Sequence, residues 1–396
     1  MNKEVLDKII NKTANKEKLA IVVVGYNKVK GLNRLLTALN RASYDSQDVP
    51  IVISIDASNN EDVYAMATNY EWQHGTKYVN IEKERLGLKK HIFQCASLSK
   101  YFKGVVILED DILVAPYFYH YCLSTLSKYG DDERVSGIAL FTNEYDGFNG
   151  LPLQHVNSGY DVFAWQTVCS WGEIWNERMW NAFERWLNNW NEDFGPIDIP
   201  RRIKEWERAW SKYVYAYIVE NDKYFIFPYE SLTTNFNDDG GEHGDGDKSI
   251  FQISLLQGKK IYHLGDFDDL VKYDIYTTNK ELPQWLGIDD SDLTVDFCGA
   301  VDLYKGHYVL TPFNLPYSQI KGFSLSMRPW ELNVKYNIKG DDLKLYHRVE
   351  SGITVPPKRE LPLSLAIYTL RGYNFKLMIR YILFRIKKRI KRQFVK

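Results

Sequence analysis

Three consecutive carboxylates, Glu109-Asp110-Asp111, directly follow the apolar run Val105 to Leu108. Such a run predicts a strand buried on both faces, so the three carboxylates would emerge together where the strand ends. Their repulsion is costly unless a cation or hydrogen-bond donors offset it. Because Mg²⁺ and Mn²⁺ prefer carboxylate and phosphate oxygens, the triplet predicts a divalent-cation site for a phosphate-bearing ligand. An acidic turn that caps the next helix is the simpler alternative.

Two further apolar runs end in polar residues of the same kind. Leu19 to Val24 ends at Gly25-Tyr26-Asn27, and Ile51 to Ile55 ends at Asp56-Ala57-Ser58. Helical spacing of leucines between these runs predicts a doubly wound, mostly parallel sheet, whose ligands bind outside the carboxyl ends of the strands. No GxGxxG follows the first run and no GxxxxGK[ST] occurs in the chain, which argues against dinucleotide and P-loop sites.

The length, charge and cysteine content of the chain limit its possible architecture, partners and cellular compartment. The chain has 396 residues, 45% of them apolar, which predicts two or three packed units. Its net charge of −1 hides an asymmetry, because residues 361–396 hold ten Lys or Arg and no acid, which leaves a body near −11. Such a body repels nucleic acid. The four cysteines are widely spaced and form no CxxC pair, which favours a reducing compartment. No apolar run reaches about 18 residues, so we expect no simple membrane-spanning helix.

The basic tail is expected to form an amphipathic helix. From residue 377 onward, apolar residues recur at steps of three or four, and most lysines and arginines fall off that line. A helix of this kind binds anionic lipid, so residues 371–396 are expected to contact a membrane surface. Docking on the acidic body and binding to RNA remain the alternatives. Few aromatic residues are interleaved for base stacking, which favours the membrane.

The motifs together resemble a known family. The stretch Val-Val-Ile-Leu-Glu-Asp-Asp-Ile-Leu-Val-Ala-Pro-Tyr-Phe, residues 105–118, is similar to N-acetylglucosaminyltransferase I and related bacterial family 2-like glycosyltransferases of GT-A fold. Further matches follow in order and cover about residues 19–260: Val22 to Asn27, Ile53 to Asp56, Ser170 to Trp175, Pro228 to Leu232, and Gly241-Glu242-His243. The resemblance implies an α/β, Rossmann-like fold with a mostly parallel sheet flanked by helices.

The resemblance also implies site roles. Asp111 would coordinate Mn²⁺ or Mg²⁺ on the diphosphate of a nucleotide-sugar donor, with a UDP-sugar favoured, and transfer would invert the anomeric carbon. His243 would lie in a lid over the diphosphate, beside the metal, although a solvated loop histidine is equally expected. The remaining donor contacts would be made by residues near the strand ends: Asp56 to the base, Asp110 to the ribose or sugar, Glu109 to the sugar, Tyr26 after the first strand, and Lys90 to phosphate.

The catalytic base is where the sequence departs from the family. Inverting transfer needs a carboxylate that takes the proton of the acceptor hydroxyl, and the segment that matches the family's Trp-Asp helix start, Trp210 to Tyr213, contains no acid. Glu207, one helical turn earlier, is the first candidate, with Glu205 and Asp161 behind it. A surface pairing of Glu207 with Arg208 or Lys212 is the structural alternative.

The expected organisation has four parts. Residues 1–18 form an extension, 19–260 the transferase domain, 261–360 an irregular strand-containing accessory region, and 361–396 the basic amphipathic tail. The expected activity is hexosyl or N-acetylhexosaminyl transfer to a glycan or lipid-linked acceptor in bacterial surface polysaccharide synthesis, at the cytoplasmic face of the membrane. A sugar nucleotidyltransferase and an inactive glycan-binding or scaffold protein are the rival interpretations; the first would need a glycine-rich loop with Arg and Lys after the first strand.

Overall fold

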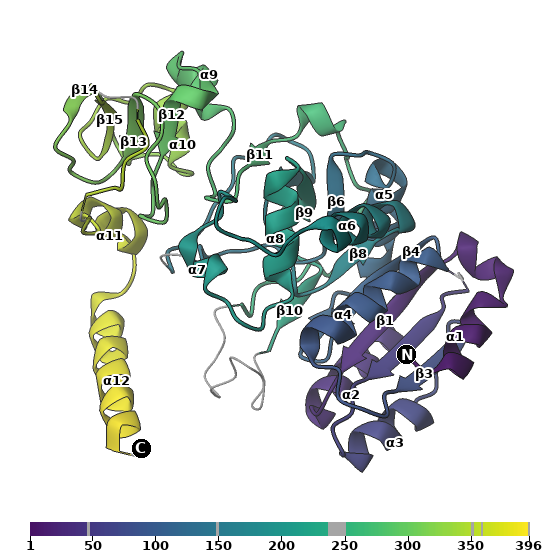
Figure 1. The fold of residues 1–396 in the computed structure, drawn as a ribbon. Coiled ribbons are helices and arrows are strands. Elements are labelled where there is room, and N and C mark those ends of the chain that lie inside the picture. The colour runs from purple at the N-terminus through teal and green to yellow at the C-terminus, as the bar shows by residue number, and fades with distance from the viewer. Residues whose placement is uncertain (46–47, 148–149, 237–250, 350–351, 358, 395–396) are drawn as a thin grey trace. The chain divides into compact units, whose positions relative to one another are not determined.

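The structure is a computed structural model, and it describes all residues except 46–47, 148–149, 237–250, 350–351, 358 and 395–396 (Figure 1). Two compact units make up the described chain. The first consists of residues 1–146 and 153–282, and the second of residues 147–152 and 283–396. Each unit has its own sheet.

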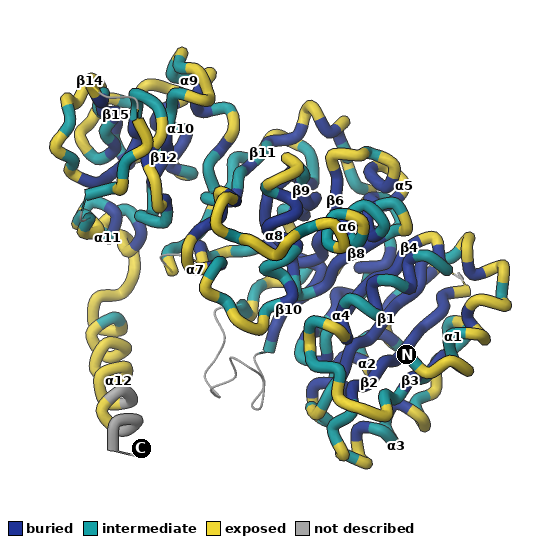
Figure 2. Tube along the Cα trace, viewed as in Figure 1, coloured by how far each residue is buried: buried dark blue, intermediate teal, exposed yellow. Residues whose placement is uncertain are grey.

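A nine-stranded sheet, in the order β11-β7-β9-β6-β8-β4-β1-β2-β3, forms the first unit. Its long apolar strands are buried along their whole length, as the dark blue centre of Figure 2 shows. The pairs β3–β2, β2–β1, β1–β4, β6–β9 and β7–β11 are parallel. The strands are β1 Leu19–Gly25, β2 Ile51–Ile55, β3 Lys77–Ile81, β4 Gly104–Glu109, β6 Val135–Ala139, β7 Val162–Trp165, β8 Glu173–Trp175, β9 Tyr224–Pro228 and β11 Lys272–Tyr273.

Helices flank this sheet, and α4, α6 and α8 lie in front of its strands in Figure 1. Their amphipathic faces supply the apolar side chains that cover the sheet, such as Leu32, Leu35 and Leu39 of α2. The expected α/β fold with a mostly parallel, helix-flanked sheet is therefore confirmed. The helices are α1 Lys3–Ile10, α2 Val29–Arg41, α3 Glu61–Asn69, α4 Leu88–Ala96, α5 Phe118–Tyr129, α6 Glu177–Asn189, α7 Arg201–Lys204 and α8 Ser211–Glu220.

One strand of the sheet runs against its neighbours at the centre. β8 lies between β4 and β6 and is antiparallel to both, with Glu173 opposite Ile107 and Trp175 opposite Val105. The β8 strand thus begins at the edge where β4 ends. A small antiparallel pair, β5 Ile112–Val114 with β10 Thr233–Asn235, continues from the acidic triplet.

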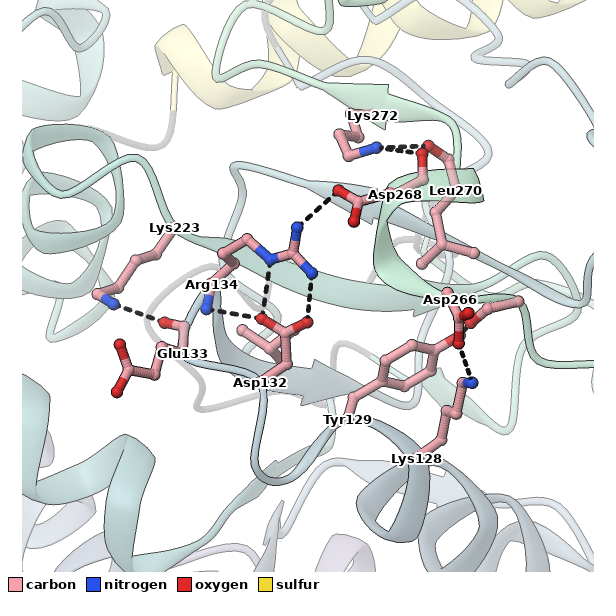
Figure 3. A network of polar contacts seen from close by, with 12 residues as sticks. Lys128, Tyr129, Asp132, Glu133, Arg134, Lys223, Asp266, Asp268, Leu270 and Lys272 are labelled. Carbon is pink, nitrogen blue, oxygen red and sulfur yellow. Dashed lines mark hydrogen bonds and ion pairs between the residues drawn. The ribbon is translucent and has the colours of Figure 1, made fainter.

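The first unit continues past the boundary expected at residue 260. β11 adds a parallel strand beside β7, and a polar network ties the segment before it to the end of α5 and the start of β6 (Figure 3). Arg134 donates to Asp132 and to Asp268, at 2.7 Å and 2.6 Å, and Tyr129 donates to the Gly265 carbonyl at 2.8 Å. Residues 1–18 also belong to this unit, since the Met1 ammonium lies 3.0 Å from Glu82.

The second unit holds a four-stranded sheet in the order β12-β13-β15-β14. The buried Asp296 of this unit forms an ion pair with the half-buried Arg359. Its elements are β12 Leu293–Val295, β13 Tyr308–Thr311, β14 Ser318–Phe323, β15 Leu343–His347, α9 Leu282–Leu286, which begins at the last residue of the first unit, α10 Glu331–Lys335, α11 Leu363–Leu370 and α12 Phe375–Phe394.

The tail forms the expected helix, α12. Its described side chains are almost all exposed, including Leu377, Tyr381 and Leu383 at 53–64% (Figure 2). Among the described residues, no helix combines the length and hydropathy that crossing a bilayer requires.

Candidate active site

Polar residues from three neighbouring parallel strands meet at one edge of the large sheet. β1 ends before Tyr26, β2 ends before Asp56, and β4 ends at Glu109, which leads into Asp110 and Asp111. Because β2, β1 and β4 are adjacent and parallel, their carboxyl ends lie side by side. The structure thus brings the expected donor-binding residues of all three strands to a single edge.

Asp56 is buried and holds a loop in place. Its carboxylate accepts backbone N–H groups from Leu86 at 2.8 Å and Gly87 at 2.9 Å, just before α4 begins. The same loop carries Arg85, whose guanidinium lies 4.6 Å from the centre of the Tyr26 ring. Asp56 therefore fixes the wall of the site beside Tyr26, whose ring offers a face on which a base can stack.

Asp110 and Asp111 share one cation, Lys28. The Lys28 ammonium lies 3.0 Å from Oδ2 of Asp111 and 3.5 Å from Oδ1 of Asp110. The other Asp110 oxygen, Oδ2, accepts the backbone N–H of Tyr26 at 3.1 Å. Burial raises the pKa of Asp110 to about 6, although Lys28 opposes the shift. For Lys28, burial lowers the pKa but the attraction of Asp111 and Asp110 outweighs it, so the pKa is raised.

Glu109, the last residue of β4, adds a third carboxyl group beside the two aspartates. Burial, together with the negative charges of Asp111 and Asp110, raises the pKa of Glu109 to about 8, while Lys28 and the Trp210 side chain act in the opposite direction. Glu109 is thus expected to carry its proton over much of the neutral range and to donate a hydrogen bond as well as accept one.

A fourth carboxyl group, Glu173, belongs to this cluster and was not expected from the sequence. Glu173 is opposite Ile107 across the β4–β8 pair, on the same face as Glu109, and only 2% of its surface is exposed. Its Oε2 atom has no hydrogen-bond partner within the described part of the chain. Burial and the nearby Glu109 raise the pKa of Glu173 well above its ordinary value. The signal in the sequence was an acid between Gly172 and Ile174, inside a short apolar strand.

Replacing Glu173 with Gln is expected to stabilise the protein increasingly as the pH rises. Below the unfolded pKa of about 4.3, Glu173 carries its proton in both states and costs nothing. Above it, the unfolded chain releases the proton and the folded chain keeps it, so wild-type stability falls by about 1.4 kcal/mol per pH unit until the folded pKa is reached. Melting curves of wild type and Glu173→Gln between pH 5 and 8 should therefore diverge, whereas the exposed Glu84→Gln should follow wild type. Parallel wild-type and Glu173→Gln curves would contradict the expectation.

The three candidates for the catalytic base occupy different places. Glu207 is exposed in the segment before α8, three residues from Trp210, whose side chain acts to lower the pKa of Glu109. Glu205 is exposed and accepts a 2.7 Å bond from Arg201. Asp161 lies 2.7 Å from the Lys260 ammonium at the start of β7, four strands from β4 and therefore about 19 Å away. Glu205 and Glu207 both precede Trp210, which lowers the pKa of Glu109, and Glu207 is the nearer of the two in the chain.

The remaining expected donor contacts are not gathered at the cluster. Lys90 is exposed in the first turn of α4, and its neighbour Lys89 donates to the Tyr213 hydroxyl at 3.0 Å. His243 lies outside the described residues. Within the described chain, no group of three His, Cys, Asp or Glu side chains is arranged to hold a metal ion.

Similarity searches give no family assignment and only distant structural likenesses. No family model and no curated protein matches the sequence. S. aureus TarS 1–349 in complex with UDP is 11% identical, with a TM-score of 0.35 over 55% of this chain and 59% of that chain. GalNAc-T7 with UDP, GalNAc and Mn²⁺ is 14% identical, with a TM-score of 0.38 over 54% and 42%. The mannosyltransferase PcManGT from Pyrobaculum calidifontis, in complex with GDP-Man and Mn²⁺, is 16% identical, with a TM-score of 0.38 over 57% and 59%. At TM-scores below 0.5, these likenesses assign neither ligand nor reaction to this chain, which spans at most 59% of each of the three neighbouring chains.

Proposed function

We propose that this chain is an inverting glycosyltransferase of GT-A fold that uses a nucleotide-diphosphate sugar, with a UDP-sugar favoured. The observation that carries the proposal is the convergence of Tyr26, Asp56 and the Glu109 to Asp111 triplet at the carboxyl ends of adjacent parallel strands. The sequence pattern of residues 105–118, with its similarity to N-acetylglucosaminyltransferase I and related enzymes, supports the same function.

The carboxylate oxygens of Asp110 and Asp111 are suitable ligands for a hard divalent cation. Mg²⁺ and Mn²⁺ are commonly held by one or two carboxylates, with water and substrate phosphate completing the coordination, so two aspartates without a third protein ligand are sufficient. Asp111, whose side chain is 18% exposed, would be the principal ligand, and Asp110 would support it. When bound, the cation would stabilise the negative charge that develops on the departing diphosphate.

The other residues would position the two substrates. Tyr26 and the loop held by Asp56 would bind the base and ribose, and Glu109 would hydrogen-bond the donor sugar. Glu207 would take the proton from the acceptor hydroxyl as that oxygen attacks the anomeric carbon from the side opposite the diphosphate. This arrangement displaces the nucleotide and inverts the configuration. The sugar would be a hexose or an N-acetylhexosamine, and the acceptor a glycan or lipid-linked glycan of a bacterial surface polysaccharide.

A panel of UDP, GDP and their sugars, each with and without Mn²⁺, tests the donor site through the melting temperature. A ligand at about 100 times its Kd adds about 2.7 kcal/mol of stability, which raises the melting temperature measurably. We expect one nucleotide class to stabilise the protein only with Mn²⁺ and its sugar to be slowly hydrolysed. Stabilisation by a nucleoside triphosphate with a sugar phosphate would favour a nucleotidyltransferase, and binding without hydrolysis would favour an inactive binding protein. No shift with any nucleotide would refute the donor site.

We further propose that α12 and the basic tail bind the anionic inner face of the cell membrane, where a lipid-linked acceptor would be presented. Exposed apolar and basic side chains alternate along α12, including Leu377, Arg380, Leu383 and Arg385. Apolar burial and attraction to anionic lipid, about 1 kcal/mol per surface cation, would act together.

Removing four tail charges should weaken vesicle binding on the order of 10²- to 10³-fold, because each contributes about 1 kcal/mol. The variant carries Gln at Lys376, Arg380, Arg385 and Lys387, and flotation with vesicles of anionic or zwitterionic lipid measures the partition. A matched variant carries Gln at four exposed lysines of the first unit, Lys3, Lys30, Lys83 and Lys103, and should bind like wild type. Equal binding of wild type to the two kinds of vesicle would contradict the proposal.

A further inference from the structure

Lys28 occupies the position that a divalent cation would need. Its ammonium is 3.0 Å from Asp111 Oδ2 and 3.5 Å from Asp110 Oδ1, and its side chain is only 17% exposed. A metal ligated by Asp111 would sit about 2 Å from the same carboxylate, within contact distance of the ammonium. Two cations in that space repel strongly because burial limits their screening by water. Lys28 and the metal are therefore competitors for one pair of carboxylates.

The position of Lys28 in the chain lets its side chain leave without unfolding anything. Lys28 is the N-cap residue of α2, and its carbonyl accepts the Leu32 N–H at 2.9 Å, which fixes the backbone. The side chain takes no part in capping the helix. Its flexible four-carbon stem allows the ammonium to move by rotation of side-chain torsions alone.

The nearby arginines do not substitute for Lys28 at the carboxylates. Arg34 donates to the backbone carbonyl of Asp111 at 3.2 Å and lies 3.8 Å from the Phe236 ring centre, while Arg85 faces Tyr26. Loss of the Lys28 charge would thus leave Asp110, Asp111 and the nearby Glu109 without the cation that now lies between the aspartates. The carboxylates would then attract an external cation more strongly.

We propose that Lys28 blocks the metal position until a nucleotide diphosphate arrives, so that metal and donor bind together and neither binds well alone. The proposal rests on the donor site proposed above. The diphosphate supplies an alternative anionic partner for the ammonium, and Lys is a common point-charge ligand of phosphate. Movement of Lys28 to the diphosphate frees both aspartates for the metal. Because coupling between two ligands is reciprocal, the metal must strengthen nucleotide binding by the same factor.

Titration of the purified protein with Mn²⁺, followed by the electron paramagnetic resonance signal of free Mn²⁺, tests this competition directly. Without nucleotide, Lys28→Met is expected to bind Mn²⁺ at least about tenfold more tightly than wild type, because a positive charge about 3 Å from the ligand oxygen is removed. With saturating UDP, the difference should shrink or reverse. The factor by which UDP strengthens Mn²⁺ binding should be smaller in Lys28→Met than in wild type.

Two variants make the result specific. Lys28→Arg keeps the charge and should bind Mn²⁺ alone as poorly as wild type, whereas Lys30→Met removes an exposed charge on the same helix and should change nothing. Equal or weaker binding of Mn²⁺ alone by folded Lys28→Met would overturn the proposal while leaving the donor site intact. If no protein binds Mn²⁺ even with UDP, the metal-dependent donor site itself is refuted.

Discussion

Asp111→Asn should abolish the metal-dependent increase in melting temperature and lower donor hydrolysis by at least about 10³-fold. Asn keeps the shape of the side chain but removes the charge that would hold the cation, and charge stabilisation by a bound metal is worth several kcal/mol at the transition state. Release of the nucleotide from the donor identified by the melting panel measures the rate. The variant should fold normally, because removal of one of three crowded acids relieves repulsion and Lys28 keeps Asp110 as its partner.

Asp62→Asn is the matched control, since Asp62 is an exposed acid in the first turn of α3. It should retain wild-type hydrolysis and the full Mn²⁺-dependent increase in melting temperature. An Asp111→Asn protein that still responds to Mn²⁺ and nucleotide together would move the metal ligand away from Asp111 and require another assignment for the acidic triplet.

Glu207→Gln should slow the reaction by about 10²- to 10⁴-fold while leaving donor binding unchanged. The range is the usual contribution of a general base, and the amide cannot accept the proton. In donor hydrolysis, water takes the place of the acceptor, so the same base is tested without knowledge of the acceptor. The nucleotide-dependent increase in melting temperature should equal that of wild type, because Glu207 is outside the group that contacts the donor in the proposed mechanism.

Glu205→Gln and Asp161→Asn serve as the comparison. The first loses only an exposed pair with Arg201, and the second loses a pair with Lys260 far from β4, so neither should lower the hydrolysis rate by more than about twofold. A wild-type rate in Glu207→Gln combined with a large loss in either of the others would reassign the base.

The sequence predicted which residues of the candidate site follow the ends of neighbouring strands. Strands β1, β2 and β4 were recognisable because each is a continuous apolar run, and parallel neighbours bring their carboxyl ends to one edge. Lys28 follows β1 at that edge, yet an exposed lysine looks the same in a sequence as one drawn between two aspartates. Its role depends on side-chain distances of 3.0 Å and 3.5 Å, which the residue pattern does not specify.

Glu173 could not be predicted from the sequence for a different reason. β8 contains three residues, too few for a periodic pattern, and it pairs with β4 across more than sixty residues of sequence. An acid in such a segment is predicted to be exposed, because buried unpaired carboxyl groups are rare. The strands of residues 293–347 were equally hard to order, since their sheet places β15 between β13 and β14.

The central position of β8 has a consequence for synthesis of the chain. Strands β1 to β4 are complete once Glu109 has been made, but one edge of β4 stays open until Trp175 can pair with Val105. At roughly 5–20 residues per second, that edge waits about 3–13 s on the ribosome. An apolar, unpaired strand edge invites pairing with other chains. Chaperone depletion during expression should therefore harm this protein more than one whose central strands pair in order of synthesis.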